Sequence, residues 1–107
     1  MPSYSFGDVV VLPFSYTDLR SEKRRPALVL LDSGDGDILV ARITSKISAS
    51  PYDVIIGGWK EVGLIVPSNV RLHKLLTIEK DHVIKKLGKL SADDLKKIRD
   101  IFRKIII

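Results

Sequence analysis

Short apolar runs separated by turn-forming residues characterise the first three quarters of the chain. Val9–Leu12 is rich in β-branched side chains and is closed by Pro13, so it predicts a buried strand. A second strand is expected over 26–31, with Pro26 at its first position, where a missing amide donor is tolerated. The polar residues 14–25 between them predict a long loop, and loops of that length are often functional.

The segment 32–37 is dense in Asp, Ser and Gly and precedes another apolar run, 38–44. This pattern predicts a hairpin that joins the strand at 26–31 to a strand at 38–44. The acidic residues also invite comparison with a calcium-binding loop. No acidic residue occupies that motif's final position, and the flanking segments are strands rather than helices, so a turn is the better interpretation.

The later segments change from strand to helix patterning. A short strand is expected over 52–56, and residues 68–78 alternate imperfectly, as in one bent strand or two consecutive ones. Residues 80–87 predict a helix that Gly88 terminates. A second helix should begin after the N-cap Ser91, with an apolar stripe packed on the sheet that comprises Leu95, Ile98, Phe102 and Ile105.

These elements together predict a fold that is mainly β with C-terminal helices, an α+β class. Several short strands followed by a helical segment fit a small, curled, antiparallel sheet, for which an SH3-like barrel is the natural candidate. The length of 107 residues and the hydrophobic fraction of 45% suit one domain, residues 1–107, with one core.

Composition excludes several kinds of chemistry. The chain has no cysteine, which rules out disulfides, thiolate nucleophiles and Cys-based zinc sites. With two histidines and no metal-ligand spacing, we expect no metal and no cofactor. The N-terminal segment lacks the pattern of a signal peptide, and no apolar run approaches the roughly 20 residues of a membrane span. We therefore expect a soluble, cytoplasmic protein without a membrane partner.

The net charge of +5 suggests an anionic partner, but its distribution matters more than its sum. Most of the excess falls after residue 78, where a Lys-rich amphipathic helix is usually just a solvated face. The local cluster Lys23-Arg24-Arg25 in the long loop is the stronger pointer to nucleic acid.

Five motifs resemble the MazF/PemK toxin family in order and spacing: Gly7-Asp8-Val9-Val10, Arg25-Pro26-Ala27-Leu28-Val29, Ala41-Arg42-Ile43-Thr44-Ser45, Leu75-Leu76-Thr77-Ile78 and Gly88-Lys89-Leu90-Ser91. The resemblance spans nearly the whole chain. It implies an SH3-like barrel of the MazF/PemK/CcdB type, a homodimer, and metal-independent, sequence-selective cleavage of single-stranded RNA by attack of the substrate's own 2′-hydroxyl. It also implies a cognate antitoxin protein as partner.

By this resemblance Arg25 corresponds to the family's catalytic arginine. Its planar guanidinium suits a phosphate whose charge grows in the transition state, whereas the plain alternative is a solvated arginine at a strand start. Thr44 matches the family's Ile-Thr position, where its hydroxyl would hydrogen-bond the scissile phosphate or a neighbouring base. The alternative for Thr44 is a β-branched residue that fills a strand.

Arg71 has the spacing to Thr77 that PemK-like members use for a second catalytic arginine. The acid expected two positions later is His73 in this chain, which is the main departure from the family pattern. A histidine is chemically suited to either proton-transfer role. Because alternate residues of a strand share a face, Arg71 and His73 should point together, toward substrate or simply toward solvent.

Further residues are expected to contact RNA without performing chemistry: Lys23, Arg24, Ser45, Lys46, Asp18 and Lys74. The basic members would hold phosphates, and Asp18 would accept hydrogen bonds from bases or from Arg25. His82 is expected at the surface. Trp59 follows Gly57-Gly58, and packing beneath that loop is more common than stacking on a base.

Two other functions remain open from the sequence. The first is a non-catalytic RNA-binding or regulatory barrel that has lost the acid/base pair, as the His73 departure permits. The second is a topoisomerase poison on the same scaffold, similar to CcdB, which acts by protein contact rather than on RNA.

Overall fold

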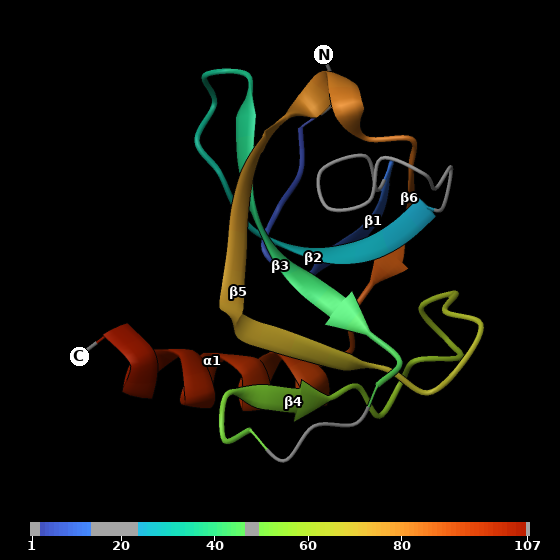
Figure 1. The fold of residues 1–107 in the computed structure, drawn as a ribbon, viewed down its shortest axis with the longest axis vertical. Coiled ribbons are helices and arrows are strands. Elements are labelled where there is room, and N and C mark those ends of the chain that lie inside the picture. Colours follow the sequence, from blue (N-terminus) through green and yellow to red (C-terminus); the bar gives the residue numbers. More distant parts are fainter. Residues whose placement is uncertain (1–2, 14–23, 47–49, 107) are drawn as a thin grey trace.

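Six antiparallel strands and one α-helix make up the computed structural model, which describes residues 3–13, 24–46 and 50–106. The sheet order is β4-β5-β3-β2-β1-β6 (Figure 1). The elements are β1 (Asp8–Pro13), β2 (Arg24–Asp32), β3 (Asp37–Thr44), β4 (Asp53–Ile55), β5 (Asn69–Glu79), the 3₁₀ turn η1 (Lys80–His82), β6 (Lys85–Lys89) and α1 (Ala92–Ile106).

The central strands are covered on both faces because the sheet curls strongly on itself. Along β1, Val9 belongs to one apolar cluster and Val10 to another. The same alternation places Leu28 of β2 in the first cluster and Val29 in the second. Successive side chains of a strand point to opposite faces, so these runs are apolar at every position rather than at every second one.

Strand β5 is continuous but sharply bent (Figure 1). Ala41 of β3 pairs with Leu75, whereas the next residue, Arg42, pairs with Arg71. The three residues 72–74 therefore have no partner on β3, and an irregularity of this kind bends a strand. The bend lets one half of β5 pair with β4 and the other half run alongside the hairpin of β2 and β3.

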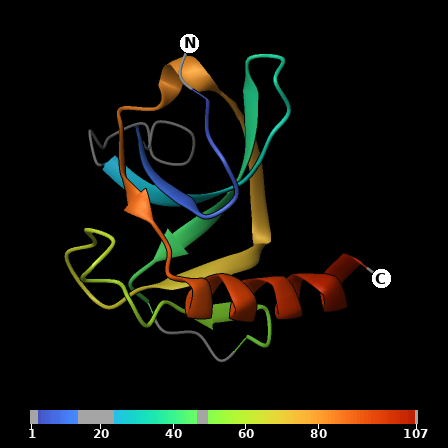
Figure 2. The same cartoon turned by 180° about the vertical axis from the view of Figure 1, so that it is seen from behind.

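Helix α1 lies across β4 and the adjoining half of β5 (Figure 2). It begins where the backbone amide of Asp94 donates to the Ser91 hydroxyl at 3.2 Å, as expected for an N-cap. Ile98 is fully buried, and Leu95, Phe102 and Ile105 pack beside it on the first cluster. The expected N-cap and apolar stripe are confirmed.

The helix expected over 80–87 is wrong. Only Lys80–His82 form a 3₁₀ turn, and Lys85–Lys89 form β6, paired with β1. Gly88 is therefore not a helix stop but a strand residue opposite Val9. A Cβ atom at Gly88 would lie 3.0 Å from the Val62 carbonyl oxygen, so close backbone packing explains the glycine.

The position expected for Pro26 is also wrong. Strand β2 already includes Arg24 and Arg25, so Pro26 lies inside the strand, opposite Val11. The described pairing of β2 with β3 begins only at Ala27, so Pro26 has a ladder neighbour on one side alone. The same observation moves Arg24 and Arg25 from the expected loop onto a strand.

The predicted fold class is confirmed as mainly β with one C-terminal helix on a small, barrel-like sheet. The turn at 32–37 is confirmed, with Gly34 and Gly36 at positive φ. Residues 68–78 form one bent strand, which is one of the two expected arrangements. No helix in the described part of the chain is long and apolar enough to cross a membrane.

Candidate functional site

A cavity of about 700 Å³ lies beside the ends of β2 and β3. Its walls come from β1, β2, β3, β5, β6 and the segment 63–68. Six basic side chains line it, and no acidic side chain does so among the described residues. The basic residues are Arg24, Arg25, Arg42, Lys46, Arg71 and Lys85. A site with this charge and no carboxylate in its lining is suited to a polyanion.

Strands β2 and β3 place two arginines at the centre of this wall. Arg25 lies opposite Leu12 of β1, and Arg42 lies opposite Ala27 of β2. Because Ala27 is two positions from Arg25, both arginines project from the same face of the sheet. Two guanidinium groups on one face provide forked donors for phosphate oxygens.

The end of β3 contributes two hydroxyls and a cation. Thr44 and Ser45 line the cavity, followed by the exposed Lys46. The backbone amide of Lys46 donates to Thr44 Oγ1 at 3.2 Å, and the side-chain amide of Asn69 donates to the Lys46 carbonyl at 3.0 Å. The backbone is thereby held where it leaves the sheet. A hydroxyl that accepts one hydrogen bond can still donate its own proton, so Thr44 can act as a donor to a ligand.

Arg71 enters the cavity from β5 with two neighbours behind it. Its Nε donates to Oδ1 of Asp53 on β4 at 3.3 Å, and its Nη2 lies 3.4 Å from Nε2 of His73. A guanidinium has no acceptor, so a hydrogen bond between Arg71 and His73 requires His73 Nε2 to be unprotonated. The His73 ring also lies against Tyr52, with 5.5 Å between the ring centroids.

A smaller cavity of about 210 Å³ adjoins the first. Arg25, Pro26 and Arg42 line both, so these residues form the wall between the two. The remaining lining is mostly apolar and includes Leu75 and Leu76, with Lys74 as a third cation. An apolar hollow next to a basic cavity is suited to a molecule that carries both anionic and aromatic groups.

The residues that lead into the 63–68 wall of the larger cavity are hydrogen-bonded to helix α1. The backbone amides of Gly57 and Gly58 donate to the two carboxylate oxygens of Asp94 at 3.0 and 2.9 Å. Burial opposes the charged form of Asp94, but these two amides and the ammonium of Lys97 outweigh it and lower the pKa of the carboxyl. The wall that follows includes Ile65, which lines the cavity although it is 92% exposed.

The structure brings together most of the residues expected from the sequence. Arg24, Arg25, Thr44, Ser45, Lys46 and Arg71 all line the larger cavity. His73 contacts Arg71 but is not part of the lining, and Lys74 lines only the smaller cavity. Lys23 and Asp18 lie outside the described residues. His82 is exposed, and Trp59 packs against the first apolar cluster, as expected.

Four residues of this site were not expected from the sequence. Arg42 stands two positions before Thr44, and strand alternation was a signal that the two share a face. Lys85 was not expected at the site because residues 80–87 were assigned to a helix. Asp53 and Asn69 act by contacts between strands, which no local pattern reveals. Among the described residues, no group of three or more His, Asp or Glu side chains is placed to hold a metal ion.

Solved structures with the same fold extend over almost the whole chain. An endoribonuclease in complex with its cognate antitoxin from a mycobacterial species is 18% identical, with a TM-score of 0.76 over 95% of this chain and 93% of that one. MazF in a MazE–MazF complex from Deinococcus radiodurans is 22% identical, with a TM-score of 0.76 over 99% and 97%. The Mycobacterium tuberculosis toxin MazF-mt6 is 20% identical, with a TM-score of 0.71 over 91% and 93%.

A search of curated proteins found no match. The sequence pattern that defines the PemK-like, MazF-like toxins of type II toxin-antitoxin systems, by contrast, matches residues 5–106. The match covers all strands and the helix, and it includes every cavity residue described above. The chain belongs to the family of PemK-like, MazF-like toxins of type II toxin-antitoxin systems.

Proposed function

We propose that this toxin is a sequence-selective endoribonuclease that cleaves single-stranded RNA without a metal, by attack of the substrate's own 2′-hydroxyl. The observation that carries the proposal is the cavity of about 700 Å³ with six basic side chains and two hydroxyls from Thr44 and Ser45. Such a lining binds a sugar-phosphate backbone and supports charge development on a phosphate.

The reaction requires three contributions from the protein. A base removes the proton from the 2′-hydroxyl, donors stabilise the pentacoordinate phosphorane, and an acid protonates the leaving 5′-oxygen. In the proposed arrangement Arg25 stabilises the phosphorane, with Arg42 beside it on the same face. Thr44 donates its hydroxyl proton to a non-bridging phosphate oxygen, and its own oxygen is already occupied by the Lys46 amide.

Arg71 and His73 complete the proposed machinery. Arg71 lines the cavity, and its positive charge stabilises the phosphorane. His73, which lies beside Arg71, takes one of the two proton-transfer roles in this proposal, that of base or that of acid. Arg24, Lys46 and Lys85 hold neighbouring phosphates.

A homodimer and a cognate antitoxin belong to the same proposal. Two similar structures contain a toxin with its antitoxin, the mycobacterial complex and the MazE–MazF complex. For this chain, we expect an acidic or amphipathic antitoxin segment to cover the basic cavity. Inhibition would follow from charge complementarity and from occupation of the site that RNA needs.

The test is product analysis with purified protein. A 5′-labelled single-stranded RNA incubated in EDTA should give discrete fragments that end in a 2′,3′-cyclic phosphate. Arg25→Ala should reduce cleavage by about 100-fold or more, the magnitude typical of a lost oxyanion donor. Arg99→Ala removes an exposed cation from α1, outside the cavity, and should cleave like the wild type.

The rival functions give different results in the same assay. Intact RNA together with measurable RNA binding would overturn the proposal in favour of a non-catalytic barrel. Toxicity that survives Arg25→Ala, with DNA supercoiling rather than RNA integrity altered in the cell, would favour the topoisomerase poison.

A further inference from the structure

A buried carboxylate stands directly behind Arg71, outside the cavity lining. Asp53 lies on the three-residue strand β4 and pairs in register with Arg71 of β5. Its side chain is only 4% exposed, whereas that of Arg71 is 27% exposed. The pair therefore reaches from the interior, at Asp53, to the cavity, at Arg71.

Within the part of the chain that the structure describes, the Asp53 carboxylate has one partner, Arg71. Oδ1 accepts from Arg71 Nε at 3.3 Å, and no donor among the described residues reaches the buried Oδ2. A buried charge is costly unless it is paired, so removal of Arg71 would leave an uncompensated carboxylate. The two residues are thus energetically coupled.

The contact with Asp53 also fixes the orientation of the Arg71 side chain in the cavity. A guanidinium is planar and rigid, so a hydrogen bond at Nε together with the His73 contact at Nη2 fixes the orientation of the whole group. Restraint matters at this position because residues 72–74, which follow Arg71, have no partner on β3. Arg71 itself pairs with Arg42 of β3, and Asp53, across the β4–β5 pair, adds a side-chain restraint to that backbone pairing.

We propose that Asp53 is a positioning residue of the ribonuclease site: its buried carboxylate fixes the Arg71 guanidinium so that the remaining N–H groups point at the scissile phosphate. The inference rests on the proposed function. Asp53 does not touch substrate and acts only through Arg71. The carboxylate partner of this arginine comes from the neighbouring strand, whereas position 73 on its own strand carries a histidine.

The experiment is a double-mutant cycle with the full chain and a labelled single-stranded RNA. Asp53→Asn, Arg71→Ala and the combined variant are compared with the wild type for kcat, KM and urea unfolding. Asp53→Asn should lower kcat by about tenfold to 100-fold, the range for a misplaced catalytic group. KM should change by less than about threefold, because the other cations still bind phosphates.

The combined variant should be no slower than Arg71→Ala alone, since Asp53 has nothing to position once Arg71 is gone. Asp53→Glu keeps the charge but moves the carboxylate by one methylene, so it takes the place of Asp53→Asn if the latter does not fold. Asp32→Asn breaks the ion pair with Lys80, in which both side chains are 8% exposed, and should lower stability without changing kcat.

The outcomes separate the inference from the function on which it rests. A wild type that leaves RNA intact overturns the proposed function and this inference with it. A wild type that cleaves, with an Asp53→Asn variant of unchanged kcat or with independent losses in the cycle, overturns the inference alone. Non-additive losses in kcat with intact folding support both.

Discussion

The buried side-chain amide of Asn69 donates to the main-chain carbonyl of Lys46 at 3.0 Å and ties the end of β3 to the start of β5. Asn69 is 3% exposed and pairs in register with Thr44. The contact therefore fixes the backbone of the residues that present two hydroxyls and a cation to the cavity.

Replacement of Asn69 should lower the stability of the protein. Asn69→Ala leaves the Lys46 carbonyl without this donor, and we expect a loss of about 1–3 kcal/mol in the free energy of unfolding, measured with urea. Asn69→Asp should be worse, because it places a carboxylate oxygen where the carbonyl needs a donor. If Asn69→Asp is more stable than Asn69→Ala, the loss of stability comes from the void left by the shorter alanine side chain rather than from the lost hydrogen bond.

Gly88 provides a direct test of strand β6. A Cβ at this position would approach the Val62 carbonyl oxygen to 3.0 Å and its Cγ2 to 3.3 Å. Gly88→Ala should therefore destabilise the protein by about 1–3 kcal/mol, as overpacking does. Lys89→Ala changes the neighbouring, exposed residue and should have a smaller effect. A Gly88→Ala variant as stable as the wild type would contradict the close approach of Val62 to this strand.

This glycine shows where local pattern failed and why. Val83, Ile84 and Leu87 have helical spacing, and a following glycine is a common helix end. The deciding information was the approach of Val62 to the Gly88 backbone, a contact between segments distant in the sequence. The sequence pattern correctly predicted elements whose formation depends on burial alone. Strand β1 is an example, because its uninterrupted apolar run indicates a strand that is covered on both faces.

The residues of the candidate site fall into the same two groups: those that the sequence predicts and those that only the contacts between strands reveal. Arg25, Thr44 and Arg71 were recognised because they stand in motifs that resemble a known family. Arg42 and Lys85 enter the cavity through strand register, and Asp53 enters through a contact between β4 and β5. Strand alternation with Thr44 was a local signal for Arg42, but Lys85 and Asp53 have none, because their places depend on how the bent sheet folds back on itself.

The ion pair of Asp32 and Lys80 should make stability depend on pH in the acid range. The Lys80 ammonium, 2.8 Å from Asp32 Oδ1, together with the Tyr4 and Gly34 amides, lowers the pKa of Asp32 from 3.8 to about 2. A carboxyl whose pKa is lower in the folded state stabilises the protein fully above its unfolded pKa. That contribution is lost as the pH falls toward the folded pKa.

The wild type should therefore exceed Asp32→Asn in free energy of unfolding above about pH 4, and the difference should shrink as the pH falls from 3.8 to about 2. Urea unfolding at a series of pH values measures it. Asp81→Asn, an exposed carboxyl on η1, is the matched control. A difference between wild type and Asp32→Asn that is constant from pH 6 to about 2 would contradict the assignment.

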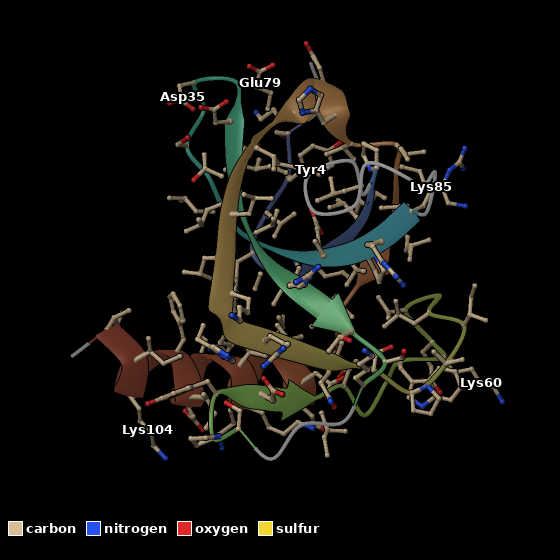
Figure 3. All side chains as sticks on the ribbon, viewed as in Figure 1. Tyr4, Asp35, Lys60, Glu79, Lys85 and Lys104 are labelled. Atoms are coloured by element: carbon tan, nitrogen blue, oxygen red, sulfur yellow. The ribbon has the colours of Figure 1, made fainter. Side chains whose placement is uncertain are left out.

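Lys85 offers the sharpest test of the cavity as the RNA site, since sequence reasoning did not select it. It lines the cavity from β6, whereas Lys104 lies at the far end of the molecule on α1 (Figure 3). Each phosphate contact to single-stranded RNA makes the slope of log affinity against log salt more negative by about 0.7. Lys85→Ala should therefore weaken binding of an RNA blocked at its 2′-hydroxyls and reduce the magnitude of that slope by about 0.7. Lys104→Ala removes the same charge and should leave the slope unchanged. Fluorescence anisotropy over a salt series measures both variants, and equal slopes for the two would place RNA elsewhere on the surface.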